Sequence, residues 1–223
     1  MTRLAIWSDF RGVLTPPLAE GVRRFCEGRN FTPEQIRQSL RAIAERHGCP
    51  DGMAVLDSGV LDERRWSGEI ERELLERFGI TADLSDFATR WWSDQRIDDA
   101  WVAALREWRA EGAFVGLLSN LPVEWRTPLA SFPAVADTFD DVLLSCDVGT
   151  RKPEAEMFRL AEARSGLAPE FHVLADDLPE NVAGACQAGW AGVLSGGDAT
   201  KSAIALIDSM VSGDAAMSEG VSR

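Results

Sequence analysis

The chain has 223 residues, of which 45% are hydrophobic and 26% are charged, and its formal net charge is −13. This length suits one globular domain, or a domain with an insert, and is sufficient to bury a substantial apolar core. The negative charge argues against nucleic acid or an anionic membrane surface as a partner, because both require clustered cations.

Cysteine and histidine usage narrows the class of protein further. The four cysteines are widely spaced and form no CxxC pair, and the sequence shows no signal peptide and no long apolar segment. We therefore expect a reducing, cytoplasmic setting and no membrane association. With two histidines in the chain, a histidine-rich zinc site is not expected, and a bound metal should be a hard cation held by carboxylates.

Short apolar runs bounded by turn residues predict buried parallel β-strands. These runs cover residues 4–7, 114–118, 142–144, 171–175 and 191–194. Helical stretches separate the later runs: Pro153 is expected to open one helix, and Pro179 another that ends at Gly189. Strands alternating with helices predict an α/β fold with a Rossmann-like parallel sheet.

Roughly a hundred residues separate the first expected strand from the second, and most of them show helical patterns. Residues 32–35 (Thr-Pro-Glu-Gln) form a capping box, and apolar residues then follow at helical spacing. A second helix is expected to end at Gly79, and a third at residues 86–92. We expect an inserted all-helical domain at residues 16–97.

The domain boundaries follow from this insert. Residues 1–15 and 98–211 are expected to form the α/β core. The tail, residues 212–223, is small and polar, and it is expected to be disordered.

Three tryptophans of the insert, Trp66, Trp91 and Trp92, are expected to pack in its helical core. The adjacent pair cannot share one face of a helix. One of these two side chains should therefore point away from that core, towards the cleft, the solvent or a partner subunit.

Reactive side chains follow several of the expected strands. They are Asp9 after the first run, Ser119 and Asn120 after the second, Asp176 and Asp177 after the fourth, and Arg151 and Lys152 ahead of a helix. Ligands of open α/β sheets bind beyond the carboxyl ends of the strands. Three carboxylates at one edge repel each other unless a cation lies among them, and Mg2+ fits this donor set.

Four segments in order, "DFRGVLT", "VGLLSN", "GTRKPEAEMF" and "LADDLPENVAGACQAGW", resemble the four motifs of the haloacid dehalogenase-like (HAD) hydrolase superfamily. The resemblance spans the core from end to end, and the helical insert is similar to the family's cap of the first type. Within the superfamily, "DFRGVLTPP" and "DDLPENV" look most like the phosphatase domain that precedes soluble epoxide hydrolases and its stand-alone bacterial relatives.

The resemblance implies catalytic roles for three residues and a substrate-binding role for a fourth. Asp9 would be the nucleophile that becomes an aspartyl-phosphate, and the Ser119 hydroxyl would donate to the transferring phosphoryl group. Asn120 would flank the same pocket and contribute to substrate binding. Lys152 would stabilise the negative charge, and it is one of only two lysines in the chain.

The resemblance also implies a Mg2+ site. Asp9, Asp177 and the backbone carbonyl of Arg11 would hold the ion, with Asp176 assisting. Gly12, which has no Cβ, would let the loop turn tightly and bring its backbone N–H groups near the phosphate.

Arg11 departs from the family's pattern, because most phosphatases of this superfamily carry an aspartate there as general acid and base. A guanidinium stays protonated and can supply neither function. We expect a Mg2+-dependent phosphatase, monomeric or homodimeric, that acts on a small phosphorylated metabolite. Either this substrate has a good leaving group, or the substrate or the cap supplies the proton donor. The Arg11 side chain would then grip an anionic substrate.

Two alternatives stay open. One is a different hydrolase of the same fold, either a C–halogen hydrolase or a phosphonate-cleaving relative, although the insert contains no lysine for the latter. The other is a binding or scaffold protein in which the Arg11 guanidinium fills the metal position and pairs with Asp9 or Asp177.

Overall fold

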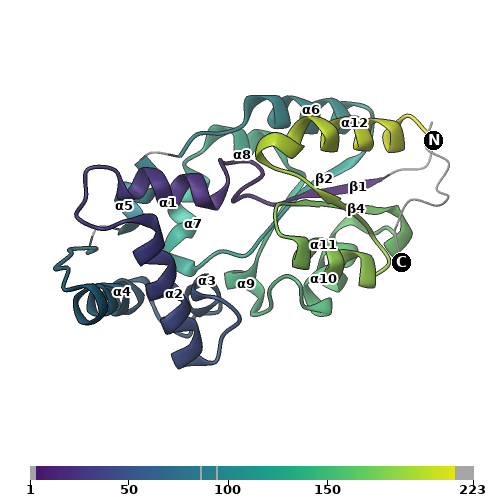
Figure 1. The fold of residues 1–223 in the computed structure, drawn as a ribbon. Coiled ribbons are helices and arrows are strands. Elements are labelled where there is room, and N and C mark those ends of the chain that lie inside the picture. Colours follow the sequence, from purple (N-terminus) through teal and green to yellow (C-terminus); the bar gives the residue numbers. More distant parts are fainter. Residues whose placement is uncertain (1–3, 86, 94, 214–223) are drawn as a thin grey trace.

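The five apolar runs form one parallel β-sheet in the computed structural model, which describes residues 4–85, 87–93 and 95–213 (Figure 1). The strands are β1 (Ala5–Ser8), β2 (Phe114–Ser119), β3 (Asp141–Leu144), β4 (His172–Asp176) and β5 (Ala191–Leu194). Their order is β3-β2-β1-β4-β5. The predicted Rossmann-like α/β fold is confirmed.

Strand β1 is the centre of the sheet and is fully buried. Its residue Ile6 aligns with Val115 of β2 on one side and with Val173 of β4 on the other. The chain leaves β1 towards β2 and later returns to the opposite side of β1, so a topological switch point lies between β1 and β4. Side chains that follow these two strands therefore meet at the position where such sheets bind ligands.

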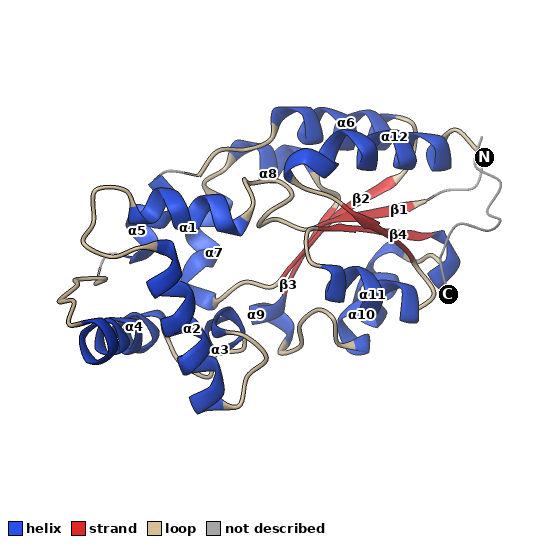
Figure 2. Ribbon diagram, viewed as in Figure 1, coloured by secondary structure: helices blue, strands red, loops and turns tan. Residues whose placement is uncertain are grey.

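Helices cover both faces of the sheet (Figure 2). One face is covered by α6 (Asp99–Ala110) and α12 (Thr200–Val211), and the other by α10 (Ala155–Ser165) and α11 (Pro179–Gln187). The indole of Trp108 on α6 donates to Asp208 on α12 at 2.7 Å, which joins the first pair. The prediction for α10 was inexact, because Pro153 precedes the helix by two residues and Ala155 begins it.

Between β1 and β2 lies the predicted helical insert, placed beyond the carboxyl ends of the strands (Figures 1 and 2). Its helices are α1 (Leu18–Cys26), α2 (Pro33–His47), α3 (Gly52–Asp57), α4 (Glu63–Phe78) and α5 (Phe87–Ser93). The capping box at the start of α2 is present, with Thr32 and Gln35 each bonding the other's backbone. Helix α4 ends at Gly79, whose φ of 66° suits glycine.

The predicted boundaries of the insert, residues 16 and 97, stay a prediction. Close to them, the Asp98 N–H donates to the Leu14 carbonyl at 2.8 Å, so the outgoing and returning segments are hydrogen-bonded to each other. The predicted tail falls almost entirely on residues 214–223, which lie outside the described residues. None of the helices in the described part of the chain combines the length and the apolar character needed to span a bilayer.

Short helical segments follow β2 and β3. They are a 3-10 turn at Val123–Trp125, α7 (Arg126–Ala130), α8 (Pro133–Thr138) and α9 (Ser145–Val148). The first of them contacts the insert, since the Trp125 indole donates to Glu63 of α4 at 2.9 Å.

The two adjacent tryptophans of α5 point in different directions, as predicted. Trp91 packs inside the insert on Phe87, with ring centroids 5.7 Å apart. Trp92 packs instead on Phe10 and Phe132 of the core, at 5.6 and 5.8 Å. The second tryptophan therefore joins the insert to the core rather than facing the cleft, the solvent or another subunit.

Candidate active site

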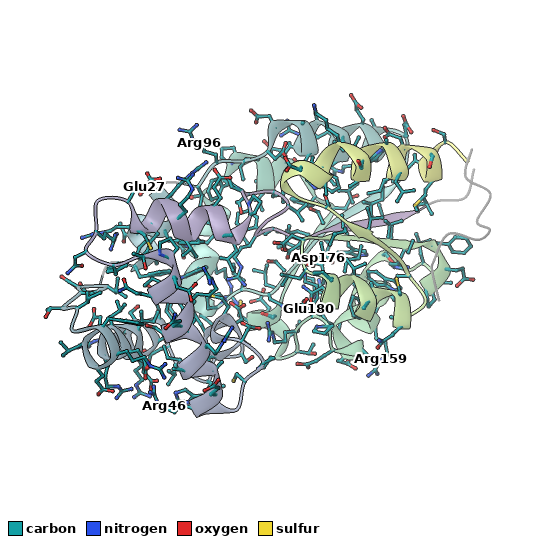
Figure 3. The ribbon with its side chains drawn as sticks, in the orientation of Figure 1. Glu27, Arg46, Arg96, Arg159, Asp176 and Glu180 are labelled. Carbon is teal, nitrogen blue, oxygen red and sulfur yellow. The ribbon has the colours of Figure 1, made fainter. Side chains whose placement is uncertain are left out.

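The first strand end contributes Asp9, whose backbone N–H extends the sheet by donating to the Ala175 carbonyl at 2.9 Å. Asp9 is 7% exposed, and Asp176, the last residue of β4, is fully buried. Figure 3 shows Asp176 and Glu180 between the sheet and the helices of the insert. Adjacent parallel strands thus bring together two carboxylates that are far apart in the sequence.

Lys152 joins these two carboxylates. Its Nζ lies 2.7 Å from Asp9 Oδ1 and 2.5 Å from Asp176 Oδ2, and its side chain is fully buried. Burial alone lowers the pKa of a lysine, yet the charges and hydrogen bonds of Asp176 and Asp9 outweigh it and raise the pKa of Lys152. The side chain is therefore a fixed cation beside Asp9.

Asn120 holds the backbone of Lys152 rather than facing the cavity with its amide. Its Oδ1 accepts from the Lys152 N–H at 2.8 Å, and its Nδ2 donates to the Lys152 carbonyl at 3.0 Å. Both ends of the amide are thereby used. Asn120 also lines the cavity in front of the acids, and its predicted role in substrate binding stays a prediction.

Asp176 is bonded on both oxygens. Oδ1 accepts from the Leu178 N–H at 3.0 Å and from Asn181 Nδ2 at 2.9 Å, while Oδ2 accepts from Lys152. This carboxylate is accordingly held rigidly and orients the lysine. Asp177, the next residue, is only partly buried and faces the cavity with Asp9.

Carboxylate oxygens of Asp9, Asp176 and Asp177 all lie within 4.8 Å of one another. Burial raises the pKa of Asp9 to about 6, with the charge of Asp176 adding to it and Lys152 opposing it. Burial, followed by the charges of Asp9 and Asp176, raises the pKa of Asp177 to about 7. The pKa of both carboxyls stays raised even though Lys152 and Arg11 oppose the rise, and the all-oxygen donor set fits a hard divalent cation.

Gly12 and Gly196 let the loops around Asp177 pack closely. A Cβ on Gly12 would lie 2.0 Å from Asp177 Oδ2, and the residue has a φ of 88°. A Cβ on Gly196 would lie 2.0 Å from the carbonyl oxygen of Gly12. The tight turn predicted at Gly12 therefore has no room for a side chain, and the backbone of this turn borders the carboxylates.

Ser119 ends β2 with its side chain fully buried. Within the described part of the chain its Oγ has no hydrogen-bond partner. A buried hydroxyl without a partner calls for an explanation, and a bound ligand would supply one, although Ser195 and Thr200 carry buried hydroxyls of the same kind. This observation fits the role predicted for Ser119 as a donor to a phosphoryl oxygen.

Arg11 is bonded to the helical insert. One Nη lies 2.6 Å from Oδ2 of Asp57, the last residue of α3, and 3.0 Å from the Asn120 carbonyl. Its guanidinium carbon also lies 5.6 Å from the centre of the Trp125 ring. Among the ion pairs of the described residues, Asp57 is the sole carboxylate partner of Arg11, so the guanidinium is not on Asp9 or Asp177.

Besides Asn181, which holds Asp176 and had no predicted role, sequence reasoning missed Asp57. It ends a six-residue helix, it belongs to none of the four motifs, and its partner lies 46 positions earlier. No local pattern signals such a contact. The one available hint is indirect: a cation at position 11 near three acids needs a carboxylate of its own.

A cavity of about 590 Å3 opens in front of these groups. Its core side includes Asp9, Arg11, Lys152 and Asp177, and its other side is formed by residues of α2 and α3. The cavity therefore lies between core and insert, as expected for a site whose access and shape depend on the insert.

The raised pKa values predict how metal-free protein responds to pH. Both carboxyls have folded-state values, about 6 for Asp9 and about 7 for Asp177, above the ordinary 3.8. Folding then favours their protonated forms, so their contribution to stability is complete below pH 3.8 and is lost as the pH rises through 6 and 7. In EDTA, the unfolding temperature should fall between about pH 4 and 7 and level off above that, and Asp177→Asn should reduce that fall. An equal fall in the variant would assign the effect to other groups.

Comparison with known proteins adds the family. A family model described as haloacid dehalogenase-like hydrolase matches residues 5–189. A phosphoserine phosphatase of Thermus thermophilus is 32% identical over 161 residues, which are 68% of this chain and 61% of that protein. The chain thus spans less than two thirds of the length of this curated relative.

Solved structures share the fold. A HAD family enzyme of Bacteroides thetaiotaomicron, in complex with magnesium and inorganic phosphate, has a TM-score of 0.60 at 20% identity, covering 90% of this chain and 98% of that one. A dehalogenase with an intermediate complex has a TM-score of 0.66 at 17% identity, covering 86% and 84%. At such identities the similarity concerns the fold alone.

Proposed function

The chain belongs to the haloacid dehalogenase-like hydrolases, and within that family we propose that it is a Mg2+-dependent phosphatase acting on a small phosphorylated metabolite. The observation that carries the proposal is the Lys152 Nζ placed between Asp9 and Asp176, with Asp177 completing a set of three acids. The similarity to a phosphoserine phosphatase supports a phosphate monoester as substrate. The closer resemblance to the phosphatase domain of soluble epoxide hydrolases stays a prediction.

In the proposed reaction, Asp9 attacks the phosphorus atom in line and forms an aspartyl-phosphate, and the substrate's alkoxide or phenoxide leaves. Water then attacks the phosphorus of that acyl phosphate, which restores the carboxylate and releases inorganic phosphate. The Asp9 oxygen that is not bonded to Lys152 is the one available for the attack.

A positive charge and a hydrogen-bond donor of this protein balance the negative charge on the transferring phosphoryl group. Lys152 supplies a buried positive charge beside Asp9, and the Ser119 hydroxyl, which has no partner among the described residues, would supply a hydrogen bond. Bound Mg2+ would supply further electrostatic stabilisation of the phosphoryl oxygens. Asp9, Asp177 and the Arg11 carbonyl would hold the ion, and Asp176, whose oxygens are already bonded, would assist by fixing Lys152.

No general acid follows the nucleophile, because position 11 is an arginine paired to Asp57. The substrate must then leave without protonation by the loop or bring its own proton donor. We therefore propose aryl or acyl phosphates, or esters whose leaving oxygen is stabilised by the substrate itself, as the substrate class. The Arg11 Nη1 is buried and has no hydrogen-bond partner in the described part of the chain, and we propose that an anionic group of the substrate pairs with it.

A halogen-hydrolysing enzyme is the second candidate, because a dehalogenase shares the fold and that chemistry needs no acid at position 11. The cluster of three acids is against it, since C–halogen hydrolysis requires no metal site. Guanidinium occupation of the metal position, the scaffold alternative, is disfavoured by the Arg11–Asp57 ion pair.

The experiment that separates these candidates measures hydrolysis of p-nitrophenyl phosphate, phosphoserine and a 2-haloacid with Mg2+ or with EDTA. We expect phosphate release from the aryl phosphate in Mg2+, and a loss of at least about a hundredfold in EDTA because charge stabilisation at the phosphoryl oxygens is removed. Halide release that is indifferent to EDTA would instead establish the dehalogenase. The absence of both activities would support a binding protein.

A further inference from the structure

The Arg11 guanidinium lies among three carboxylates that compete for it. Burial disfavours its charged form, yet the pKa of Arg11 is raised, because Asp57, Asp9 and Asp177 all lie close enough to stabilise the cation. The ion pair that forms is the one with Asp57, at 2.6 Å. The other two carboxylates are those proposed to hold Mg2+, so the choice of partner decides whether the metal site is open.

The position of Asp57 is determined by contacts within the insert, not by residues of the core site that it contacts. The helix that it ends, α3, is capped by Asp51, which accepts from the backbone N–H groups of Met53 and Ala54. At the start of α3, the Gly52 carbonyl accepts from the Trp66 indole of α4 at 2.8 Å. The side chain of Asp57 is 1% exposed, so its carboxylate is a preset acceptor with no alternative in solvent.

Helix α3 also packs against α2 without a gap. A Cβ on Gly52 would lie 2.6 Å from the Cβ of Leu40 on α2. Helix α3 is thus packed on α2 and hydrogen-bonded to α4, so the backbone that carries Asp57 is supported by the insert. The position of Arg11 is therefore set by the insert.

The Arg11–Asp57 ion pair contains a single hydrogen bond, from Nη2 of Arg11 to Oδ2 of Asp57. Nη1 of Arg11 and Oδ1 of Asp57 are both buried and have no hydrogen-bond partner in the described part of the chain. Among the described residues, the guanidinium makes one further hydrogen bond, to the Asn120 carbonyl at 3.0 Å, and that oxygen carries no full charge. A buried cation that loses its carboxylate is strongly destabilised. Without Asp57, the guanidinium would therefore turn to Asp9 or Asp177.

We propose that Asp57 is a positioning residue that keeps the Arg11 guanidinium off Asp9 and Asp177, so that these two carboxylates stay open to Mg2+. The inference rests on the proposed function in one respect, because that function identifies the bound cation as Mg2+. Asp57 touches neither the metal nor the substrate and acts through Arg11. Position 57 of the insert thereby controls the electrostatics of a site that belongs to the core.

The test is the Mg2+ affinity of substrate-free protein, measured by isothermal titration calorimetry. Asp57→Asn is expected to weaken binding by about 10- to 100-fold, the range found when a residue that orients a metal site is removed. Asp57→Glu, which keeps the charge, should retain most of the affinity. The double variant Arg11→Ala/Asp57→Asn should bind Mg2+ as tightly as Arg11→Ala, because no guanidinium remains to compete and the backbone carbonyl at position 11 is kept.

Glu63→Gln is the matched control. Glu63 also joins the insert to the core, since its Oε2 accepts from the Trp125 indole at 2.9 Å, but it does not contact Arg11. Its amide variant should leave Mg2+ affinity unchanged. Thermal unfolding followed by circular dichroism shows which variants are folded.

Wild-type affinity in Asp57→Asn overturns the proposal. Weak binding that persists in the double variant also overturns it, because the effect then does not pass through Arg11. If Asp57→Asn does not fold, the comparison of Arg11→Ala with the double variant decides, and unequal affinities contradict the proposal. A wild-type chain that hydrolyses no phosphate, while Asp57→Asn still loses Mg2+ affinity, removes the proposed function and leaves this inference standing.

Discussion

Asparagine at position 9 is expected to lower kcat for p-nitrophenyl phosphate by about 10⁴-fold or more, in the range found when an enzyme nucleophile is removed. The amide has nearly the shape of the carboxylate but cannot attack phosphorus as an anion. It also places a neutral group beside Lys152 Nζ, which lies 2.7 Å from the Asp9 oxygen. The fold should survive, because Asp176 continues to pair with the lysine.

The measurement is steady-state hydrolysis together with acid quenching of the reaction, which traps phosphate bound covalently to the protein. Wild-type protein should carry label from a radioactive substrate, and Asp9→Asn should not. Asp198→Asn, an exposed change of the same chemistry, serves as the control and should behave as wild type. Undiminished turnover in Asp9→Asn would assign the attack to another group.

Lys152→Met is expected to lose both activity and stability. The substitution leaves Asp9 and Asp176 buried without their shared cation, and breaking a buried ion pair in this way costs about 3–5 kcal/mol of unfolding free energy. Loss of the positive charge next to the phosphoryl group should lower kcat by about 10²–10³-fold, as for other groups that stabilise charge in the transition state. The two effects have one cause, because the same Nζ contacts both acids.

Chemical denaturation and kinetics at saturating Mg2+ check this second expectation. Lys201→Met is the matched control, since Lys201 is the chain's other lysine and lies exposed at the start of α12. Its removal should change neither quantity. A Lys152→Met protein as stable as the wild type would show that the two carboxyls are protonated in the folded state, and that the lysine is not their counter-ion.

The strands and the acids of the core could be predicted because both depend on local sequence. Short apolar runs bounded by turns indicate buried strands, and parallel strands bring their carboxyl ends to one edge by geometry alone. Asp9 and Asp177 therefore follow from the pattern before any contact is known. The contact of Lys152 with both Asp9 and Asp176 is compatible with its predicted charge-stabilising role, whereas the Mg2+ expected among these acids stays a prediction.

The contacts between insert and core could not be predicted in the same way. Asp57 meets Arg11, and Trp92 meets Phe10, only because of how α3 and α5 pack on the core. Neither helix carries a signal of its partner, and α3 is too short to show periodicity. The use of the Asn120 amide to hold the Lys152 backbone is likewise a tertiary contact. Long-range pairing of this kind depends on the whole fold.

The buried Arg11–Asp57 pair constrains how this sequence can evolve. A mutation that restored an aspartate at position 11 by itself would place it against the fixed carboxylate of Asp57, which is 1% exposed, and two buried acids without a counter-ion repel each other. Asp57 would have to be replaced by a neutral residue first, yet that substitution leaves the buried Arg11 guanidinium without its carboxylate partner. Each change is harmful without the other, so single substitutions at position 11 should be selected against. Relatives with an acid at the equivalent of position 11 should lack one at the equivalent of position 57.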